Sequence, residues 1–462
     1  MDFSKRIAAQ KAQLVEQLQS LVRIDSVEGE PAPGMPFGPG PAKALEKGLS
    51  ICRDMGFKTV NLDNYIGYAE YGEGEELLAI LGHMDVVPVG DGWTMDPFCA
   101  EVVGNRLYGR GSYDDKGGVV AAIHALKAVA EEGCRFHRRV RIILGANEET
   151  GMNDIPYYLE REGEPDLAFS PDSPFPVAYG EKGVLDFDVL FPLKDGTHLC
   201  SMQGGDNRKF TPDSCTVVLR VSEAERAEVH VACAKGGLPF FCDAKDIAPD
   251  KIEITTGGRR VFAVRPWEGE NAIAHMVEFL QKIPFLADDM GDFCNYYMTK
   301  FGYVYDGSNI DCVFKDDIST PISFSADMVQ ITDGKIVISV HSRFPVTADC
   351  DEVVGRIGGA YGVNGATVEF IRVSPAHYMP ADSELVSTLI KVYRDVTGEA
   401  NAQPVTMEGG TYARTLKNAV AFGPLFPGEP QVAHSADEYV NLDSLEKAAN
   451  IYAQAIYALC CK

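Results

Sequence analysis

The amino-acid sequence predicts an α/β protein in which an inserted α+β domain interrupts a larger, discontinuous domain. In the first part of the chain, short apolar runs alternate with helical patterns, which is typical of a mostly parallel mixed sheet flanked by helices. From about residue 183 the sequence becomes rich in strand patterns, and near residue 377 it returns to helices. We therefore expect one domain from residues 1–182 and 377–462, and a second from residues 183–376.

The larger domain is expected to open with two helices, over residues 5–23 and 41–55, joined by a loop rich in proline and glycine. A third, strongly apolar helix is predicted over residues 119–130, because a run of this length with few polar residues suits a buried helix. Apolar runs between these helices predict strands over residues 59–62, 66–71, 77–81, 140–144 and 167–169.

The inserted segment combines strand patterns with one helix, expected over residues 271–283. Its strands are predicted over residues 186–191, 216–222 and 252–256, with two more between residues 323 and 343. The chain then returns to helical patterns over residues 383–397, 411–416 and 442–459.

Three of the predicted buried strands end in acidic residues or histidine. These residues are His83, Asp85, Glu148, Glu149 and Asp172. Parallel strands place their carboxyl ends at one edge of a sheet, so we expect these side chains to converge. A single histidine of this kind would be equally consistent with an ordinary core residue, but independent coincidences at several strand ends are improbable.

A glycine-rich turn with two adjacent acids, Asp114 and Asp115, precedes the apolar helix and adds to this cluster. Imidazole and carboxylate groups in one site fit two divalent cations with nitrogen and oxygen ligands. A bridging carboxylate would hold such ions roughly 3.5–4 Å apart, the spacing of hydrolytic two-metal sites. Two adjacent glutamates allow one to bind metal while the other acts as a general base.

The formal net charge of −25 makes nucleic acid and acidic membrane surfaces poor partners. The chain has no apolar run long enough to cross a bilayer, and its first residues lack a signal-peptide pattern. The 12 cysteines include no CxxC pair. We therefore expect a cytoplasmic protein with reduced thiols, most of which serve in packing.

Five motifs, in order along nearly the whole chain, carry a resemblance to a known family. They are GHMDVVP, GRGSYDDKGG, NEETG, SPD followed by YGEKG, and a late histidine, His434. This set resembles the two-zinc metallopeptidases that include aminoacylase, carboxypeptidase G, succinyl-diaminopimelate desuccinylase and the dipeptidases. The stretches SPDSPFPVAYGEKG, HSRFPVT and GGTYAR resemble the PepV-type dipeptidases in particular.

The resemblance implies a cytoplasmic enzyme that cleaves dipeptides with a free carboxyl terminus. Residues 1–182 and 377–462 would form the catalytic domain, and residues 183–376 a lid or substrate-binding domain. The cofactors would be two Zn²⁺, with Mn²⁺ or Co²⁺ as alternatives. Relatives with a long inserted domain are expected to be monomers, because the insert replaces a contribution from a partner subunit.

The resemblance also assigns roles to individual residues. The implied metal ligands are His83, Asp114, Glu149, Asp172 and His434. Asp114 would bridge the two ions and be joined to Asp115 by a cis peptide bond. Asp85 would orient His83, and Glu148 would be the general base that activates the bridging water.

On the substrate side, the resemblance implies that Arg343 binds the carboxylate and that Gly409, Gly410 and Thr411 line the site with backbone groups. A planar guanidinium suits a bidentate contact with a carboxylate. For Arg343 the alternative is an interdomain salt bridge. For the two glycines it is a turn that starts a helix.

The inserted domain departs from the family pattern at two positions. The family places a lid histidine four residues before a proline, here Pro266, but Phe262 occupies that position. In GGDNRKFTP, Lys209 stands where the family has asparagine, with Asn207 two residues earlier. Loss of one oxyanion donor typically costs about 100- to 1,000-fold in rate. Two alternatives therefore stay open, an N-acyl amino acid amidohydrolase and a metal-binding homologue with weakened catalysis.

Overall fold

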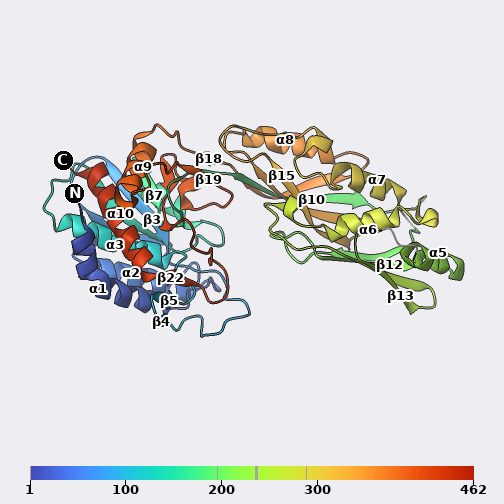
Figure 1. Ribbon diagram of the computed structural model, residues 1–462, viewed down its shortest axis with the longest axis horizontal. Helices are drawn as coiled ribbons and strands as arrows, with labels where there is room; N and C mark the ends of the chain where they lie inside the picture. Colours follow the sequence, from blue (N-terminus) through green and yellow to red (C-terminus); the bar gives the residue numbers. More distant parts are fainter. Residues whose placement is uncertain (1, 195, 235–237, 288, 462) are drawn as a thin grey trace. The chain divides into compact units, whose positions relative to one another are not determined.

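The computed structural model describes residues 2–194, 196–234, 238–287 and 289–461. It divides into two compact units: unit 1 comprises Met1–Glu181 and Tyr378–Lys462, and unit 2 comprises Lys182–His377 (Figure 1). The predicted α/β architecture, with a mixed sheet flanked by helices and a second α+β region, is confirmed. Within the described ranges, none of the helices is both long and apolar enough to span a membrane.

Unit 1 is built on a 9-stranded mixed sheet with the order β1-β2-β6-β3-β7-β20-β9-β18, in which β19 also pairs with β9. Its strands are β1 (Lys58–Leu62), β2 (Ile66–Tyr71), β3 (Leu77–His83), β6 (Arg139–Gly145), β7 (Leu167–Ser170), β9 (Ala178–Glu181), β18 (His377–Tyr378), β19 (Val405–Met407) and β20 (Ala419–Ala421). The central strands β6, β3, β7 and β20 run parallel, whereas β1 and β2 are antiparallel to their neighbours.

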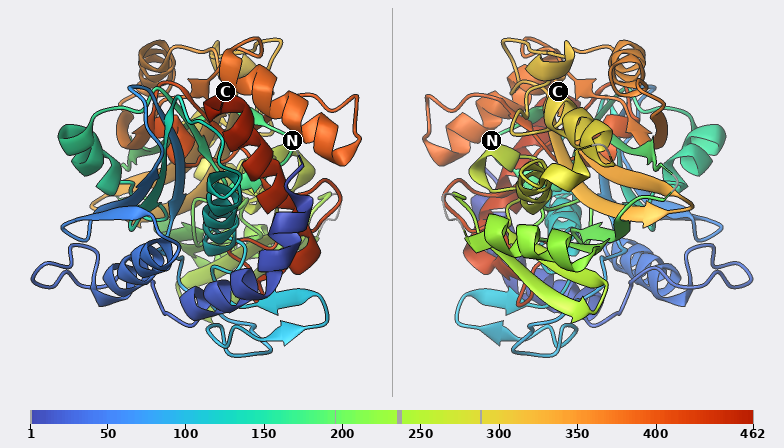
Figure 2. Two further views of the ribbon diagram at one scale, coloured as in Figure 1. Left: turned by 90° about the vertical axis from the view of Figure 1, so that its left-hand side faces the viewer. Right: turned by 90° about the vertical axis from the view of Figure 1, so that its right-hand side faces the viewer.

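Helices cover both faces of this sheet. They are α1 (Ser4–Val22), α2 (Pro39–Asp54), α3 (Lys116–Ala130), α4 (Asp154–Glu162), α9 (Glu384–Thr397) and α10 (Leu442–Cys460). One face packs in a core with α1, α2, α3, α9 and α10, and the other packs with α4. Helices from both ends of the chain, blue and red in Figure 2, therefore complete the same unit.

Strand β3 forms because its apolar residues are buried on both faces of the sheet, as expected for the centre of a parallel sheet. It pairs in parallel with β6 and β7, with His83 opposite Gly145 and Ile80 opposite Phe169. The carboxyl ends of the three strands consequently meet at one edge. This edge carries the residues singled out by the sequence.

Unit 2 contains an 8-stranded antiparallel sheet with the order β13-β14-β12-β11-β15-β16-β10-β17. Its strands are β10 (Gly183–Pro192), β11 (Leu199–Gly204), β12 (Ser214–Arg220), β13 (Cys242–Ala248), β14 (Lys251–Gly257), β15 (Ser323–Thr332), β16 (Lys335–Phe344) and β17 (Thr367–Ser374). Its helices are α5 (Glu223–Ala234), α6 (Ala272–Leu280), α7 (Gly291–Lys300) and α8 (Cys350–Tyr361). Apolar residues of the sheet and of these helices form one core.

Several elements differ from the sequence prediction. The helix expected over residues 411–416 is a short 3₁₀ turn, Tyr412–Thr415. The short strands β9, β18, β19 and β20 were not predicted, because two to four residues rarely show a periodic pattern. Cys134 and Cys461 are joined as a disulfide, whereas all thiols were expected to be reduced. Their separation of 327 residues hides this proximity from the sequence.

Candidate metal centre

The fold of unit 1 brings together the polar residues that follow its central strands. His83 is the last residue of β3, Glu148 and Glu149 follow β6, and Asp172 follows β7. A fourth contribution comes from Asp114, which lies two residues before the first residue of α3. The predicted convergence of these groups is therefore observed.

Asp114 lies between two histidines. Its Oδ1 is 3.1 Å from Nε2 of His83, and its Oδ2 is 3.1 Å from Nε2 of His434. The peptide bond between Asp114 and Asp115 is cis, in agreement with the expectation. A carboxylate that offers one oxygen to each of two imidazoles has the arrangement required of a bridging metal ligand.

Each histidine also faces a second carboxylate. Nε2 of His434 is 3.1 Å from Oε2 of Glu149, and Nε2 of His83 is 3.8 Å from Oδ2 of Asp172. Ligand atoms of His83, Asp114 and Glu149 all lie within 4.8 Å of one another. His83 is buried, whereas the side chain of His434 is 46% exposed and marks the open side of the centre.

Asp85 holds the centre together in two ways. Its backbone carbonyl lies 2.9 Å from Nδ1 of His83, so the Nε2 atom of this imidazole is directed at Asp114. Its carboxylate accepts hydrogen bonds from the backbone N–H groups of Glu148 (3.2 Å) and Glu149 (3.1 Å). The carboxylate thus fixes the turn that carries both glutamates, a role that the sequence did not indicate.

The centre brings several acidic groups together in a buried site, and this shifts their pKa values. Burial, with the neighbouring carboxylates, raises the pKa of Glu148 and of Asp172 well above the usual range. Burial alone would also raise the pKa of Asp114, but His434 and His83 outweigh it and lower that pKa. Carboxylates that repel one another gain most from bound cations, so this donor set fits two divalent metal ions.

Asp115 contacts the backbone of His83, and Gly82 and Gly118 leave room for its carboxylate. Oδ2 of Asp115 accepts a hydrogen bond from the backbone N–H of His83 (3.3 Å). A Cβ atom on Gly82 would lie 2.4 Å from that oxygen, and one on Gly118 would lie 2.3 Å from Oδ1 of Asp115. Both positions therefore require glycine, which explains the glycine of GHMD and the second glycine of DDKGG.

Glu438 is a buried residue that the sequence motifs did not indicate, and it joins the segment after His434 to the loop that carries Asp114. Its Oε1 accepts hydrogen bonds from the backbone N–H groups of Gly111, Tyr113 and Asp114, at 3.0, 3.1 and 3.2 Å. Its Oε2 lies 2.6 Å from a guanidinium nitrogen of Arg110. Glu438 follows His434 by four residues in the sequence, and its short distance from a predicted ligand could have drawn attention to it.

Thr411, which follows the predicted pair Gly409 and Gly410, contacts a second buried carboxylate, that of Glu181. The backbone N–H and the hydroxyl of Thr411 both donate to Glu181, at 3.1 and 2.7 Å, and its carbonyl accepts from Arg414. The main-chain polar groups of Thr411 thus have partners within unit 1. Gly409, Gly410 and Thr411 all stay candidates for backbone contacts with substrate, because a carbonyl oxygen can accept a second hydrogen bond.

The departures from the family pattern lie together in unit 2. Phe262 pairs with Phe210 across an isolated antiparallel bridge, and their rings stack with centroids 4.9 Å apart. The carbonyl of Lys209 accepts from Ala263, and the backbone N–H of Lys209 donates to the side chain of Asn207. Phe262 is 64% exposed and presents an aromatic face without a hydrogen-bond donor.

Arg343, the predicted carboxylate-binding residue, lies on β16 of the same unit. Its Nε donates to Nε2 of His341 at 3.0 Å.

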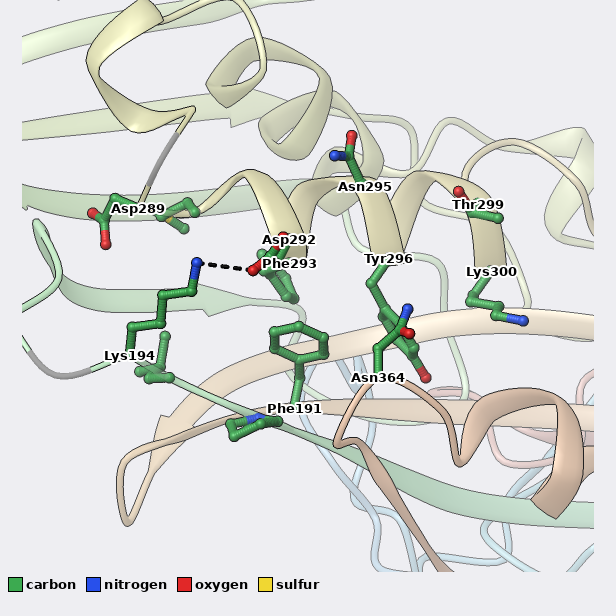
Figure 3. A pocket seen from close by; sticks show the side chains of 13 residues that line it. Phe191, Lys194, Asp289, Asp292, Phe293, Asn295, Tyr296, Thr299, Lys300 and Asn364 are labelled. Carbon is green, nitrogen blue, oxygen red and sulfur yellow. Dashed lines mark ion pairs between the residues drawn. The ribbon is translucent and has the colours of Figure 1, made fainter.

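A cavity of about 580 Å³ elsewhere in unit 2 is lined by Phe191, Tyr296 and other residues of β10 and α7, with an ion pair between Lys194 and Asp292 (2.8 Å; Figure 3). It contains none of the predicted site residues.

A family model and several known proteins match this chain. The model of peptidase family M20/M25/M40 matches residues 79–458. YtjP of Bacillus subtilis (strain 168), whose name assigns it provisionally to the dipeptidases, is 35% identical over 99% of this chain and 100% of its own length. The Beta-Ala-Xaa dipeptidase of Lactobacillus delbrueckii subsp. lactis is 31% identical over 99% of this chain and 98% of its own.

Two solved structures share the fold at low sequence identity. Human carnosine dipeptidase 1 has a TM-score of 0.58 at 15% identity and covers 99% of this chain and 98% of that chain. Aminoacylhistidine dipeptidase from Vibrio alginolyticus has a TM-score of 0.55 at 14% identity and covers 96% of this chain and 95% of that chain.

Proposed function

This chain belongs to peptidase family M20/M25/M40, and we propose that it is a dipeptidase that hydrolyses the amide bond of dipeptides with a free carboxyl terminus. The names of the relatives at 35% and 31% identity support the substrate class. The observation that carries the proposal is the carboxylate of Asp114 between His83 and His434, with Glu148 in the adjacent turn.

We assign the metal ligands to five residues of unit 1: His83, Asp114, Glu149, Asp172 and His434. The ions, for which we propose Zn²⁺ with Mn²⁺ or Co²⁺ as alternatives, act as Lewis acids when bound and lower the pKa of a water molecule toward about 7. Asp85 orients His83 through its carbonyl and positions Glu148 through its carboxylate.

Glu148 is the proposed general base. It takes a proton from the attacking water and passes this proton to the departing amine nitrogen, so that the carboxylate is regenerated in each cycle. Its neighbour Glu149 faces His434, so the two glutamates have separate tasks.

Unit 2 is proposed to act as the lid or substrate-binding domain, with Arg343 binding the carboxylate of the substrate. Gly409, Gly410 and Thr411 are proposed to contribute backbone contacts. We also propose that the protein is a cytoplasmic monomer. Light scattering coupled to gel filtration would test the oligomeric state, and a dimer would contradict this part of the proposal.

The function is tested by measuring amino acid release from a panel of substrates with Zn²⁺, Mn²⁺ or Co²⁺ added. The panel contains α-dipeptides, β-alanyl dipeptides and N-acetyl amino acids. We expect turnover of dipeptides to exceed that of N-acetyl amino acids. The reverse order would favour an N-acyl amino acid amidohydrolase. Tight metal binding without turnover of either class would favour a homologue with weakened catalysis.

A further inference from the structure

Arg343 belongs to a chain of three hydrogen-bonded polar residues on the sheet of unit 2. Its Nε donates to Nε2 of His341 at 3.0 Å, and Nδ1 of His341 lies 2.7 Å from Oδ1 of Asp186. His341 and Arg343 are two residues apart on β16, so their side chains project from the same face. Asp186 on β10 is directly opposite His341 in the register of the two strands.

The partners of His341 define its protonation state. A guanidinium nitrogen can only donate, so Nε2 of His341 must carry its lone pair toward Arg343. The proton of the neutral imidazole is then on Nδ1, where it is donated to the carboxylate of Asp186. Asp186 thus selects the tautomer of His341, and that tautomer gives Arg343 a fixed acceptor.

The surroundings of His341 keep this arrangement in place. The imidazole is buried, with only 7% of the residue exposed, and Ser325 of β15 lies opposite it on the other side. Among the charged groups around the pair, Arg372 is opposite Asp186 on β17, and Arg208 bonds to Asp188 two residues further along β10. Within the described part of unit 2, Asp186 provides the one carboxylate in hydrogen-bond contact with His341.

We propose that His341 and Asp186 are positioning residues that set the orientation of the Arg343 guanidinium for the carboxylate of the substrate. The Nε–H bond lies in the plane of the guanidinium, so a fixed acceptor at Nε fixes the direction of this bond and restricts the orientation of the plane. A preoriented guanidinium binds a carboxylate with less loss of side-chain conformational freedom than a mobile guanidinium does. The inference rests on the proposed function, because it deepens the role given there to Arg343.

The test compares a dipeptide with the same dipeptide as its carboxyl-terminal amide, which lacks the charged group. The measured quantity is the ratio of the two kcat/KM values. We expect His341→Ala to lower this ratio at least about 10-fold, chiefly through a higher KM for the free acid, and Arg343→Ala to lower it further. His341→Gln retains an acceptor for Arg343 and a donor for Asp186, so it should restore part of the ratio.

A double-mutant cycle separates positioning from a general effect on folding. Adding His341→Ala to Arg343→Ala should leave the ratio unchanged, because the orientation of an absent guanidinium has no consequence. Ser339→Ala is the matched control: this serine lies on the same strand and face but donates to Asp188 (2.7 Å). It should leave the ratio unaltered even where it lowers the unfolding temperature.

Two outcomes overturn the inference and are distinct from failure of the proposed function. In the first outcome, Arg343→Ala abolishes the preference for the free acid over the amide, whereas His341→Ala preserves it. Arg343 would then need no positioning by His341. In the second outcome, His341→Ala lowers the ratio of the two kcat/KM values equally in the presence and absence of Arg343. His341 would then have a separate structural role. Absence of dipeptide turnover in the wild-type protein would instead remove the proposed function itself.

Discussion

Asp114 presents one carboxylate oxygen to His83 and the other to His434, each at 3.1 Å from the facing Nε2 atom. The two histidines come from a strand end near the start of the chain and a loop near its end. One short carboxylate therefore connects the two halves of the discontinuous unit at the point where we place the metal ions.

The bridging role of Asp114 predicts a specific metal defect. Asp114→Asn keeps the shape of the side chain but removes its charge, so the variant should bind fewer than two ions per chain. Activity should fall at least about 100-fold, the upper end of losses seen when residues around metal ligands are replaced. Metal content after dialysis, measured by mass spectrometry, checks the stoichiometry. Two tightly held ions in the variant would contradict the assignment.

Glu438 should support both folding and metal affinity. Glu438→Gln removes the buried ion pair with Arg110, and breaking such a pair costs about 3–5 kcal/mol of unfolding free energy. Metal affinity should weaken about 10- to 100-fold, because the Asp114 loop loses its anchor. Urea unfolding and competition with a chelator measure the two effects. Asp437→Asn, at the adjacent residue that bonds to Thr94, is the control and should change both much less.

Stability should depend on pH through His341. Burial, with Arg343, lowers the pKa of His341 below its ordinary value of about 6.5, although Asp186 acts the other way. The unfolded chain then binds this proton more readily, so the contribution is fully present above about pH 6.5 and is lost as pH falls through the folded-state pKa. The stability advantage of wild type over His341→Gln, from urea unfolding, should be constant between pH 7 and 8 and shrink on acidification. An advantage that grows toward acid pH would contradict the neutral state of His341.

Replacing the exposed Phe262 with histidine should change the rate of dipeptide turnover. If this position is that of the family's lid histidine, Phe262→His introduces a hydrogen-bond donor and should raise kcat on a dipeptide, because one oxyanion donor is typically worth about 100- to 1,000-fold. Phe210→Leu, which removes the stacked ring but adds no donor, is the matched control. No gain in kcat for Phe262→His would mean that another group already serves as donor or that the alignment at this position is wrong.

Much of the fold and most of the metal centre could be predicted from the sequence, because buried parallel strands leave a strong apolar signal. The run from Leu77 to Leu81 ends two residues before His83, and the strand end fixes where that side chain lies. The same reasoning placed Glu148 and Asp172.

The contacts that were missed join segments far apart in the sequence. Glu438 bonds to Gly111 across 327 residues, and Asp85 reaches the backbone of Glu148 across 63. Short strands such as β20 depend on partner strands elsewhere in the chain, here β7 and β9. Periodicity records which face of an element is buried, but it carries no record of such partners.

The central claim is that Glu148 acts as the base within an intact metal centre, and Glu148→Gln tests it most directly. Metal content and kcat on the best dipeptide would be measured on the same preparation of the variant and of the wild-type protein. The account predicts two ions per chain in both and a kcat at least about 100-fold lower in the variant, the lower end of what general base catalysis contributes. Equal metal content with an unchanged kcat would contradict it.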